Sequence, residues 1–412
     1  MWGAALPFLR QSRRLGPTFD LRLDPFCLPE ADLWIQAASA GEAFLALPIL
    51  KQLCPDKTTR VLVTTTTDQG MEILEQGLDH MGKKGRLVIT LGYFPFDRPD
   101  LIKRVIRQVG PKAVVLLETE IWPALFYHLK KQKIPCLILN GRMSRKSFRN
   151  YRLTRGLWAG IFPDTILCIS DMDAQRYQKV FPDSAISTMP NIKFEAMNGE
   201  TNPETRNMLP NLPNTLKLSI LASLRRQEET QGIRMLRHLL RQYPDQAVAV
   251  FPRHMHRIKP WKNHLKKHRL DFILKSTLDN RPEKALKPGD IILWDRFGEM
   301  RSAYARASAV FVGGSLRPLG GQNFIEPVLK GTPTVIGPFW EDFSWVGKKI
   351  FDRDIVVKKG SWQGAARAMV SFLETPPDKK ELRQKAAAYI ASQRGGTGLA
   401  CRAIMEALET KN

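Results

Sequence analysis

Hydrophobic and polar positions alternate between two kinds of stretch along most of the chain. Short runs rich in Leu, Val, Ile and Thr, such as residues 33–37, 60–67 and 113–117, are each followed by apolar residues at helical spacing. The short runs predict buried strands, and the 3.6-residue period that follows them predicts helices packed against those strands. Their repetition predicts βαβ units around a parallel sheet, which is the α/β fold class.

A second block of the same kind begins near residue 216, with apolar runs at 246–253, 290–295, 308–315 and 332–338. Between the two blocks, residues 190–216 are rich in Pro and Asn and have little periodicity, which indicates a crossing between domains. A chain of 412 residues is also too long for one compact core. We therefore expect two Rossmann-like doubly wound domains facing across a cleft. The expected limits are 33–195 for the first domain, 196–216 for the linker and 217–412 for the second, whose last helix is able to cross back.

The formal net charge is +23, which attracts anionic partners such as nucleic acid, anionic lipid or phosphorylated small molecules. We expect residues 1–32 to form a basic amphipathic N-terminal segment, because residues 1–16 mix Trp, Leu and Phe with three Arg as interfacial amphipathic segments do. A disordered basic start explains the same pattern equally well. No apolar run is long enough to span a membrane or to form a signal peptide, so we expect a soluble or peripheral protein. The five scattered cysteines predict neither disulfides nor a zinc site.

Ligands of doubly wound sheets bind beyond the carboxyl ends of the strands. Glu42 follows the first expected strand, and Ser39 and Gly41 beside it let backbone approach a ligand. Spacing alone favours a helix-capping role for Glu42. Hydroxyls, acids and a cation stand at the ends of three further strands, and we expect them to line a cleft: Thr66 among Thr64–Thr67, Glu118 and Glu120, and Asn140 with Arg142.

The stretch 310–338 (VFVGGSLRPLGGQNFIEPVLKGTPTVIGP) carries the clearest ligand signal of the second half. A buried strand stops at a Gly-Gly-Ser turn whose bare backbone can approach a phosphate, and a polar glycine loop leads into a helix. We expect the helix amides to bind anionic oxygens and an acid near its start to bind ribose hydroxyls. The residues concerned are Gly313, Gly314, Ser315, Gly321, Asn323 and Glu326.

Six motifs occur in order along the chain: WIQAASAGE (34–42), TTTTDQG (64–70), ETEIWP (118–123), NGRMSRKS (140–147), PNIKFE (190–195) and GGQNFIEPVLKGTPTVIGP (320–338). This set resembles that of the 3-deoxy-D-manno-octulosonic acid (Kdo) transferases, the enzymes that attach Kdo to the lipid A precursor. The similarity runs from about residue 33 to residue 345.

The resemblance implies a metal-independent glycosyltransferase of the GT-B type, with CMP-Kdo as donor, lipid IVA as acceptor and no cofactor. It implies a monomer that binds the anionic surface of the inner membrane peripherally at its cytoplasmic face, and does not bind nucleic acid. Glu42 matches the general base of an inverting transfer, which reverses the capping interpretation. Donor contacts are implied for Lys193, Ser223, Arg225 and Arg253 beside the glycine-loop residues, and sugar or acceptor contacts for Ser39, Gly41, Thr66, Glu118 and Arg142.

The sequence also departs from the family pattern. Residues 224–227 read Leu-Arg-Arg-Gln where the family has Thr-His-Xaa-Gly, and Pro190 and Asp342 replace a usual Gly and Asn. These changes keep open an alternative, a GT-B glycosyltransferase with another nucleotide sugar or acceptor. The net charge suggests a second alternative, a nucleic-acid or membrane binder without catalysis, but that function does not explain why acids stand at the strand ends.

Overall fold

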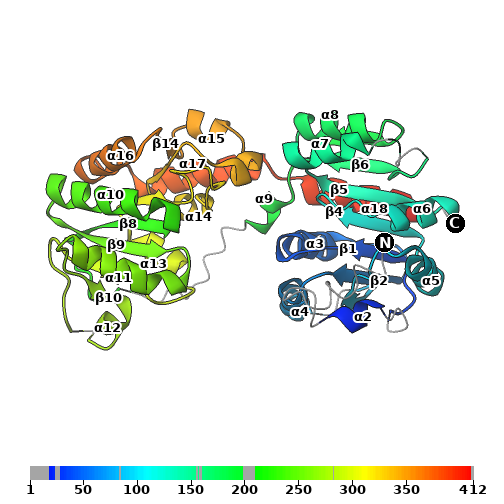
Figure 1. Ribbon diagram of the computed structural model, residues 1–412, viewed down its shortest axis with the longest axis horizontal. Coiled ribbons are helices and arrows are strands. Elements are labelled where there is room, and N and C mark those ends of the chain that lie inside the picture. Colours follow the sequence, from blue (N-terminus) through cyan, green and yellow to red (C-terminus); the bar gives the residue numbers. More distant parts are fainter. Residues whose placement is uncertain are drawn as a thin grey trace. The chain divides into compact units, whose positions relative to one another are not determined.

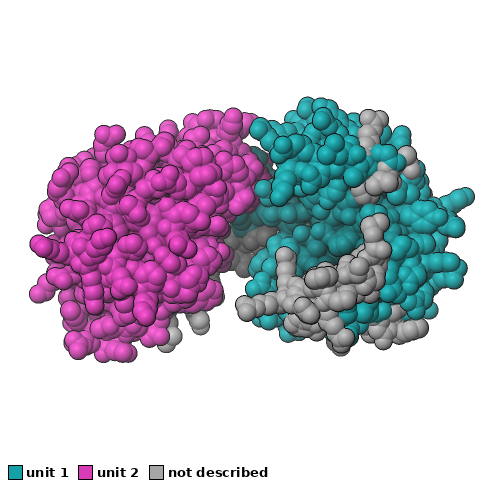
Figure 2. Space-filling model, viewed as in Figure 1, with its two compact units in different colours: residues 1–198, 393–412 teal, residues 199–392 magenta. Residues whose placement is uncertain are grey.

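A computed structural model describes residues 18–23, 28–82, 85–154, 156, 160–197, 209–281 and 283–409. The chain divides into two compact units, which Figure 2 shows in different colours. Unit 1 comprises residues 1–198 and 393–412, and unit 2 comprises residues 199–392. The amphipathic segment expected at residues 1–16 lies outside the described residues. The domain limits expected at residues 195 and 217 stay predictions.

Unit 1 is built on a seven-stranded sheet in the order β3-β2-β1-β4-β5-β6-β7, and all its strand pairs are parallel. Its strands are β1 (Leu33–Gln36), β2 (Thr59–Thr65), β3 (Leu87–Tyr93), β4 (Ala113–Leu117), β5 (Cys136–Gly141), β6 (Thr165–Cys168) and β7 (Ala185–Thr188). Its helices are α2 (Phe19–Leu23), α3 (Ala40–Gln52), α4 (Asp68–Met81), α5 (Pro99–Val109), α6 (Pro123–Lys131), α7 (Arg145–Leu153), α8 (Asp171–Val180), α9 (Lys193–Ala196) and α18 (Gly396–Glu409).

Helices cover both faces of this sheet, because successive strand residues point to opposite sides. Leu33 and Ile35 of β1 belong to a core with α3, α4 and α18, whereas Trp34 belongs to a second core with α5, α6 and α8. The continuous apolar strands of the sequence pattern follow from this double burial. The red helix α18 lies among the strands and helices of unit 1 in Figure 1.

Unit 2 repeats the plan with a parallel seven-stranded sheet in the order β10-β11-β9-β8-β12-β13-β14. One face packs against α10, α11 and α16. Its strands are β8 (Lys217–Leu224), β9 (Gln246–Pro252), β10 (Ile273–Leu274), β11 (Ile291–Leu293), β12 (Ala309–Val312), β13 (Thr334–Ile336) and β14 (Val357–Lys358). Its helices are α10 (Glu229–Gln242), α11 (Ile258–Lys267), α12 (Lys275–Asp279), α13 (Met300–Arg306), α14 (Ile325–Leu329), α15 (Lys349–Asp352), α16 (Trp362–Glu374) and α17 (Lys379–Ser392).

The segments at 190–197 and 393–397 are tied together within unit 1. Gly395 and Thr397 donate their backbone N–H groups to Glu195 Oε1 at 2.8 and 3.1 Å. A Cβ on Gly396 would lie 2.1 Å from the carbonyl oxygen of Pro190, so only glycine fits there. The start of α18 is therefore fixed against the end of the PNIKFE motif.

The prediction of two α/β units with parallel sheets is confirmed. Within the described residues, no helix is both long and apolar enough to cross a membrane.

Candidate active site

The strand order of unit 1 reverses at β1, which pairs with β2 on one side and β4 on the other. The loops after β1 and β4 therefore leave the sheet in neighbouring positions at its carboxyl edge. Such a switch point is where doubly wound sheets bind ligands. It is also where the chain places Glu42, Glu118 and Glu120.

Glu42 lies in the first turn of α3 and is only 8% exposed. Its side chain turns back toward the loop after β1. Oε2 accepts the Ala38 N–H at 2.5 Å, and Oε1 accepts the Ser39 hydroxyl at 3.1 Å. The carboxyl thus binds loop groups just before the helix, as a cap does. These contacts are the ones that the capping interpretation of Glu42 describes. They do not prevent the carboxyl from having a catalytic role as well.

The electrostatic setting of Glu42 differs from that of an ordinary cap. Burial raises the pKa of this carboxyl to about 8, with further contributions from the charges of Glu120 and Glu118 and partial opposition from its two hydrogen bonds. Burial likewise raises the pKa of Glu120 to about 7. A carboxyl that titrates near neutral pH is suited to taking a proton from a hydroxyl and returning it to solvent.

The two acids after β4 do not lie on one extended face, although side chains two residues apart in a strand would do so. Glu118 has a φ of 56°, so the backbone turns into the left-handed region directly after the strand. Its carboxylate pairs with Lys193 Nζ at 2.5 Å, whereas Glu120 accepts the Trp122 indole N–H at 2.7 Å. The cation beside the acids is therefore Lys193, and its expected role as a donor contact stays a prediction.

The other predicted acceptor residues surround this edge with different roles. Thr66 donates its hydroxyl to the Ala38 carbonyl at 2.5 Å, which holds the loop that Glu42 contacts. Gly41 is exposed, and a Cβ there would meet only the Ser39 hydroxyl at 3.8 Å, so packing in unit 1 does not require glycine. Arg142 is half-buried after β5. Thr67 caps α4 by accepting the Gly70 N–H.

Unit 2 has its switch point at β8, between β9 and β12. Ser223, near the end of β8, has a φ of 53° and its hydroxyl contacts the sulfur of Met300 at 3.7 Å. Gly313 follows β12, and a Cβ there would lie 2.8 Å from the Ser223 carbonyl oxygen. Close approach of the two strand ends thus explains this glycine.

Three predicted site positions share one backbone feature. Glu118, Asn140 and Ser223 all have positive φ at the carboxyl ends of strands. Left-handed backbone costs free energy in residues other than glycine, on the order of 1 kcal/mol each. Such strain gathers at functional sites, which supports the selection of these strand ends.

Sequence reasoning missed Glu228, which follows β8 and is fully buried. Its Oε2 accepts the Gly314 N–H at 2.6 Å and the Arg225 N–H at 3.2 Å, and its Oε1 accepts the Leu316 N–H at 2.7 Å. The Gly-Gly-Ser turn was expected to offer bare amides to a phosphate, but Glu228 occupies two amides of this segment. Ser315 is also engaged, since its hydroxyl donates to the Val312 carbonyl and accepts the Gly337 N–H.

Cations remain as the anion-binding groups of this edge. Arg253 follows β9, and its N–H donates to the Leu224 carbonyl at 2.9 Å, which brings it beside Arg225. Burial lowers the pKa of His254, and the charges of Arg253, His256 and Arg225 lower it further. The Nε of Arg225 is buried and has no hydrogen-bond partner among the described residues. An anion brought to this cluster would meet unused donors.

The remaining predicted residues lie around α14. Gly321 has a φ of 84° and donates its N–H to the Gly314 carbonyl at 2.8 Å. Asn323 lies just before the short helix, where its side-chain oxygen accepts the Ile325 N–H at 3.1 Å and its amide donates to Glu326 Oε1 at 3.0 Å. Arg301 pairs with the same Glu326 oxygen at 3.1 Å. Glu326 is therefore held by two partners at the edge of unit 2.

The sequence is similar to known enzymes over most of its length. A family model for 3-deoxy-D-manno-octulosonic-acid transferase (kdotransferase) matches residues 10–196. The 3-deoxy-D-manno-octulosonic acid transferase of Haemophilus influenzae is 28% identical over 403 residues, which cover 94% of this chain and 89% of that protein. The enzyme of the same name from Bordetella pertussis is 26% identical over 386 residues, covering 92% and 87%. The chain is thus similar to Kdo transferases over most of its length, and these matches support a member of that family.

The same matches support a glycosyltransferase with Kdo transferase activity. A solved glycosyltransferase from Rickettsia africae shares the two-domain α/β fold, with a TM-score of 0.58 and 10% identity over 93% of this chain and 99% of that one. Among the residues that the structure describes, no group of three or more His, Cys, Asp or Glu side chains has the arrangement of a metal site.

Proposed function

We propose that this Kdo transferase moves Kdo from CMP-Kdo to lipid IVA with inversion at the anomeric carbon, and that Glu42 is the general base. The observation that carries the proposal is the buried Glu42 carboxyl at the carboxyl end of β1, whose pKa burial and two neighbouring acids raise to about 8. A pure cap gains nothing from acids placed beside it, whereas a base gains a higher proton affinity.

In the proposed reaction, ionised Glu42 takes the proton of an acceptor hydroxyl. The hydroxyl oxygen forms a bond to the Kdo anomeric carbon while the bond from that carbon to the phosphate oxygen breaks. CMP leaves with the electron pair of the broken bond, and the proton stays on Glu42 until water removes it. A positioned base of this kind contributes about 10²- to 10⁴-fold to the rate.

Residues of unit 2 would bind the departing nucleotide. Arg225 and Arg253 supply positive charge where the CMP phosphate gains negative charge, in the role that a metal ion has in other enzymes. Glu326 keeps a ribose-binding role in the proposal, and Asn323 and Arg301 hold its carboxylate in one orientation. Gly313, Gly314 and Gly321 then act by shaping the loop rather than by donating free amides, because their N–H groups already have partners.

We propose further that the chain works as a monomer, peripherally bound to the anionic surface of the inner membrane at its cytoplasmic face. The net charge of +23 supports this placement, since each Lys or Arg near anionic lipid contributes about 1 kcal/mol. Sedimentation with vesicles that contain anionic phospholipid tests it, and binding that is equal with neutral vesicles contradicts it.

The direct test of the reaction is incubation of the purified chain with CMP-Kdo and lipid IVA. We expect release of CMP and a lipid product heavier by one or more Kdo residues, with the mass giving their number. The anomeric configuration of the product, read by NMR, tests inversion. No product from lipid IVA would exclude this acceptor.

The altered loop at residues 224–227 supports one rival, a glycosyltransferase reaction with a different nucleotide sugar. A panel of CMP- and UDP-sugars separates the two, because only CMP-Kdo supports turnover under our proposal. Faster turnover with another donor would replace the proposed substrate. The alternative of a nucleic-acid binder without catalysis is tested by measuring polynucleotide binding. It requires binding that weakens with salt and that does not depend on Glu42.

A further inference from the structure

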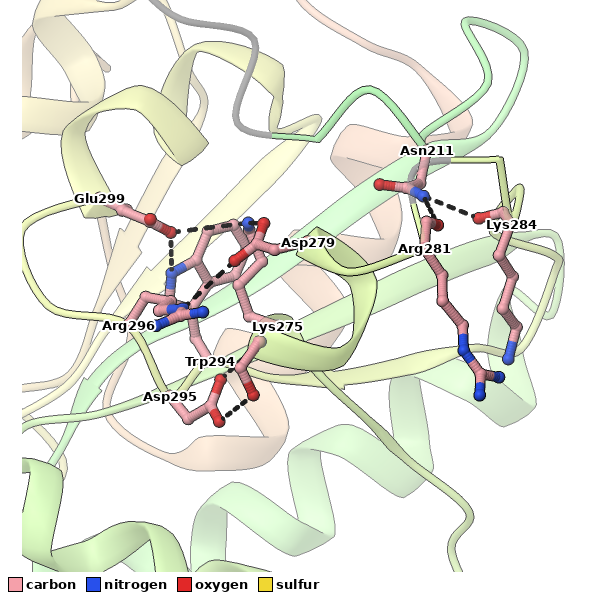
Figure 3. Close-up of polar contacts among 10 residues, drawn as sticks. Asn211, Lys275, Asp279, Arg281, Lys284, Trp294, Asp295, Arg296 and Glu299 are labelled. Carbon is pink, nitrogen blue, oxygen red and sulfur yellow. Dashed lines mark hydrogen bonds and ion pairs between the residues drawn. The ribbon is translucent and has the colours of Figure 1, made fainter.

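A buried lysine lies at the carboxyl edge of unit 2, outside every motif of the sequence analysis. Lys275 begins α12 and is 2% exposed. Burial of an ammonium group is costly unless acids pair with it. Here Asp279, one turn along α12, and Glu299, 3.7 Å from Nζ, supply the charges. Figure 3 shows these side chains meeting between α12 and the loop that follows β11.

Trp294 completes the network. Its indole N–H donates to Glu299 Oε2 at 3.0 Å, and Lys275 Nζ lies 5.3 Å from its ring centroid. The ring stacks on Phe251 of β9, with centroids 4.4 Å apart and planes at 21°. Cation–π and stacking contacts of this kind orient both partners. Trp294 therefore connects Lys275 and the loop after β11 to the end of β9.

The far side of α12 is fixed as well. Asn211 donates its amide to the carbonyl oxygens of Arg281 and Lys284 at 2.9 and 3.0 Å, which holds the segment that follows the helix (Figure 3). Ser276 donates its N–H and its hydroxyl to Asp295 at 2.8 and 2.6 Å. The helix that carries Lys275 is therefore held in place by hydrogen bonds near both of its ends.

Glu299 connects this network to the predicted donor residues. It is the N-cap residue of α13, and its carbonyl oxygen accepts the N–H groups of Ser302 and Ala303 at 3.1 Å. The next residue, Met300, accepts the Ser223 hydroxyl, and Arg301 pairs with Glu326. The first turn of α13 therefore contacts the side chains of Ser223 and Glu326, two of the predicted donor residues.

We infer that Lys275 is a positioning residue for the nucleotide subsite, which acts through Glu299 and the first turn of α13. It does not itself touch substrate. Removal of its charge lets Glu299 and Trp294 move, and this displaces Met300 and Arg301 from the groups that they hold. Small displacements of binding groups are costly in enzymes because the site is preorganised. The inference rests on the proposed function, since it names the subsite that CMP-Kdo uses.

The test compares Lys275→Met with Lys217→Met under steady-state conditions. Lys217 is the matched control, because its Nζ likewise lies near an aromatic ring, that of Tyr243, and contacts the Leu373 carbonyl oxygen, but at the amino end of β8. For Lys275→Met we expect KM for CMP-Kdo to rise about tenfold, with kcat and KM for the acceptor within about threefold of wild type. Lys217→Met should leave all three constants unchanged, and Lys275→Arg should restore much of the donor KM.

An unchanged donor KM in folded Lys275→Met, or an equal rise in Lys217→Met, overturns the inference. If Lys275→Met does not fold, Glu299→Gln is measured instead, since it keeps the size of the side chain and an oxygen for Trp294. A raised donor KM in Glu299→Gln supports the inference and an unchanged one overturns it. Absence of wild-type turnover with CMP-Kdo is a different result, because it contradicts the proposed function itself.

Discussion

The carboxyl end of β1 in unit 1 gathers acids, whereas the carboxyl end of β8 in unit 2 gathers cations. Both edges are switch points of parallel seven-stranded sheets, and both include a residue with left-handed backbone, Glu118 in one and Ser223 in the other. At the first edge, the pKa of Glu42 is raised by burial and by like charge; at the second, the pKa of His254 is lowered by burial and by neighbouring arginines. The same topology thus places the proposed base in one unit and the proposed anion-binding residues in the other.

The largest effect that tests this contrast is expected from Glu42→Gln. The glutamine keeps an oxygen for the Ala38 N–H but takes no proton, so kcat should fall by about 10³-fold while KM for CMP-Kdo is unchanged. CMP release measures both constants. Glu72→Gln, an exposed acid of the same unit, is the control. Activity within a few-fold of wild type would leave Glu42 only the cap role.

Glu228→Ala should produce the next largest effect, on folding rather than on chemistry. Its removal leaves the N–H groups of Gly314, Leu316 and Arg225 unpaired, and each buried unpaired group costs about 1 to 3 kcal/mol. We expect the free energy of unfolding to fall by about 3 kcal/mol or more in urea titrations. Glu381→Ala, an exposed acid of unit 2, should change it little. Equal stability of the two variants would show that the turn does not depend on Glu228.

Arg225→Ala tests the cationic edge by itself. Loss of one charge-assisted contact of about 1.5 to 3 kcal/mol should raise KM for CMP-Kdo by roughly ten- to a hundredfold. The Kd of CMP, measured by calorimetry, should rise in parallel, and it should respond less to salt than in wild type. The exposed Arg237 of α10 provides the control variant, Arg237→Ala. If both variants bind CMP as wild type does, the nucleotide lies elsewhere in unit 2.

The smallest expected effect is a shift in a pH profile. Because the base must be ionised, kcat/KM should rise with pH and level off above the Glu42 pKa of about 8. The charge of Glu120 contributes to that raised pKa, so Glu120→Gln should move the rise to lower pH, with a smaller change in its plateau. Rates from pH 5.5 to 9.5 in constant ionic strength measure this. If the pH profile of Glu120→Gln is the same as that of wild type, the charge of Glu120 does not influence the group whose ionisation controls kcat/KM.

The fold and the strand ends were predictable because both follow from local pattern. Apolar runs buried on both faces predict parallel strands, and a polar residue after such a run predicts the carboxyl edge. Glu42 and Glu118 were selected in this way, whereas Ser223 was named from the family resemblance. The raised pKa of Glu42 was not predictable, since it depends on acids that come close only in the folded sheet.

Contacts between distant segments account for what the sequence did not reveal. Glu228 and Gly314 are 86 residues apart, and Lys193 and Glu118 are 75 apart, so no local pattern marks either pair. The glycine turn looked like an anion site because its own residues offer amides, but a buried acid from another loop competes for them. Glu228 is the first of two consecutive acids in the stretch RRQEE that follows β8, and this acid near a strand end was the signal that could have prompted the correction.

The return of the chain to unit 1 has a consequence for biosynthesis. Ala400, Ile404 and Leu408 of α18 complete one of the two cores of unit 1, and the Glu195 carboxylate accepts the N–H groups of Gly395 and Thr397. On the ribosome, unit 2 is translated in full before those residues exist. The domain that is made first is thus the last to finish folding, and a nascent chain arrested before residue 393 should leave its apolar sheet face open to chaperones.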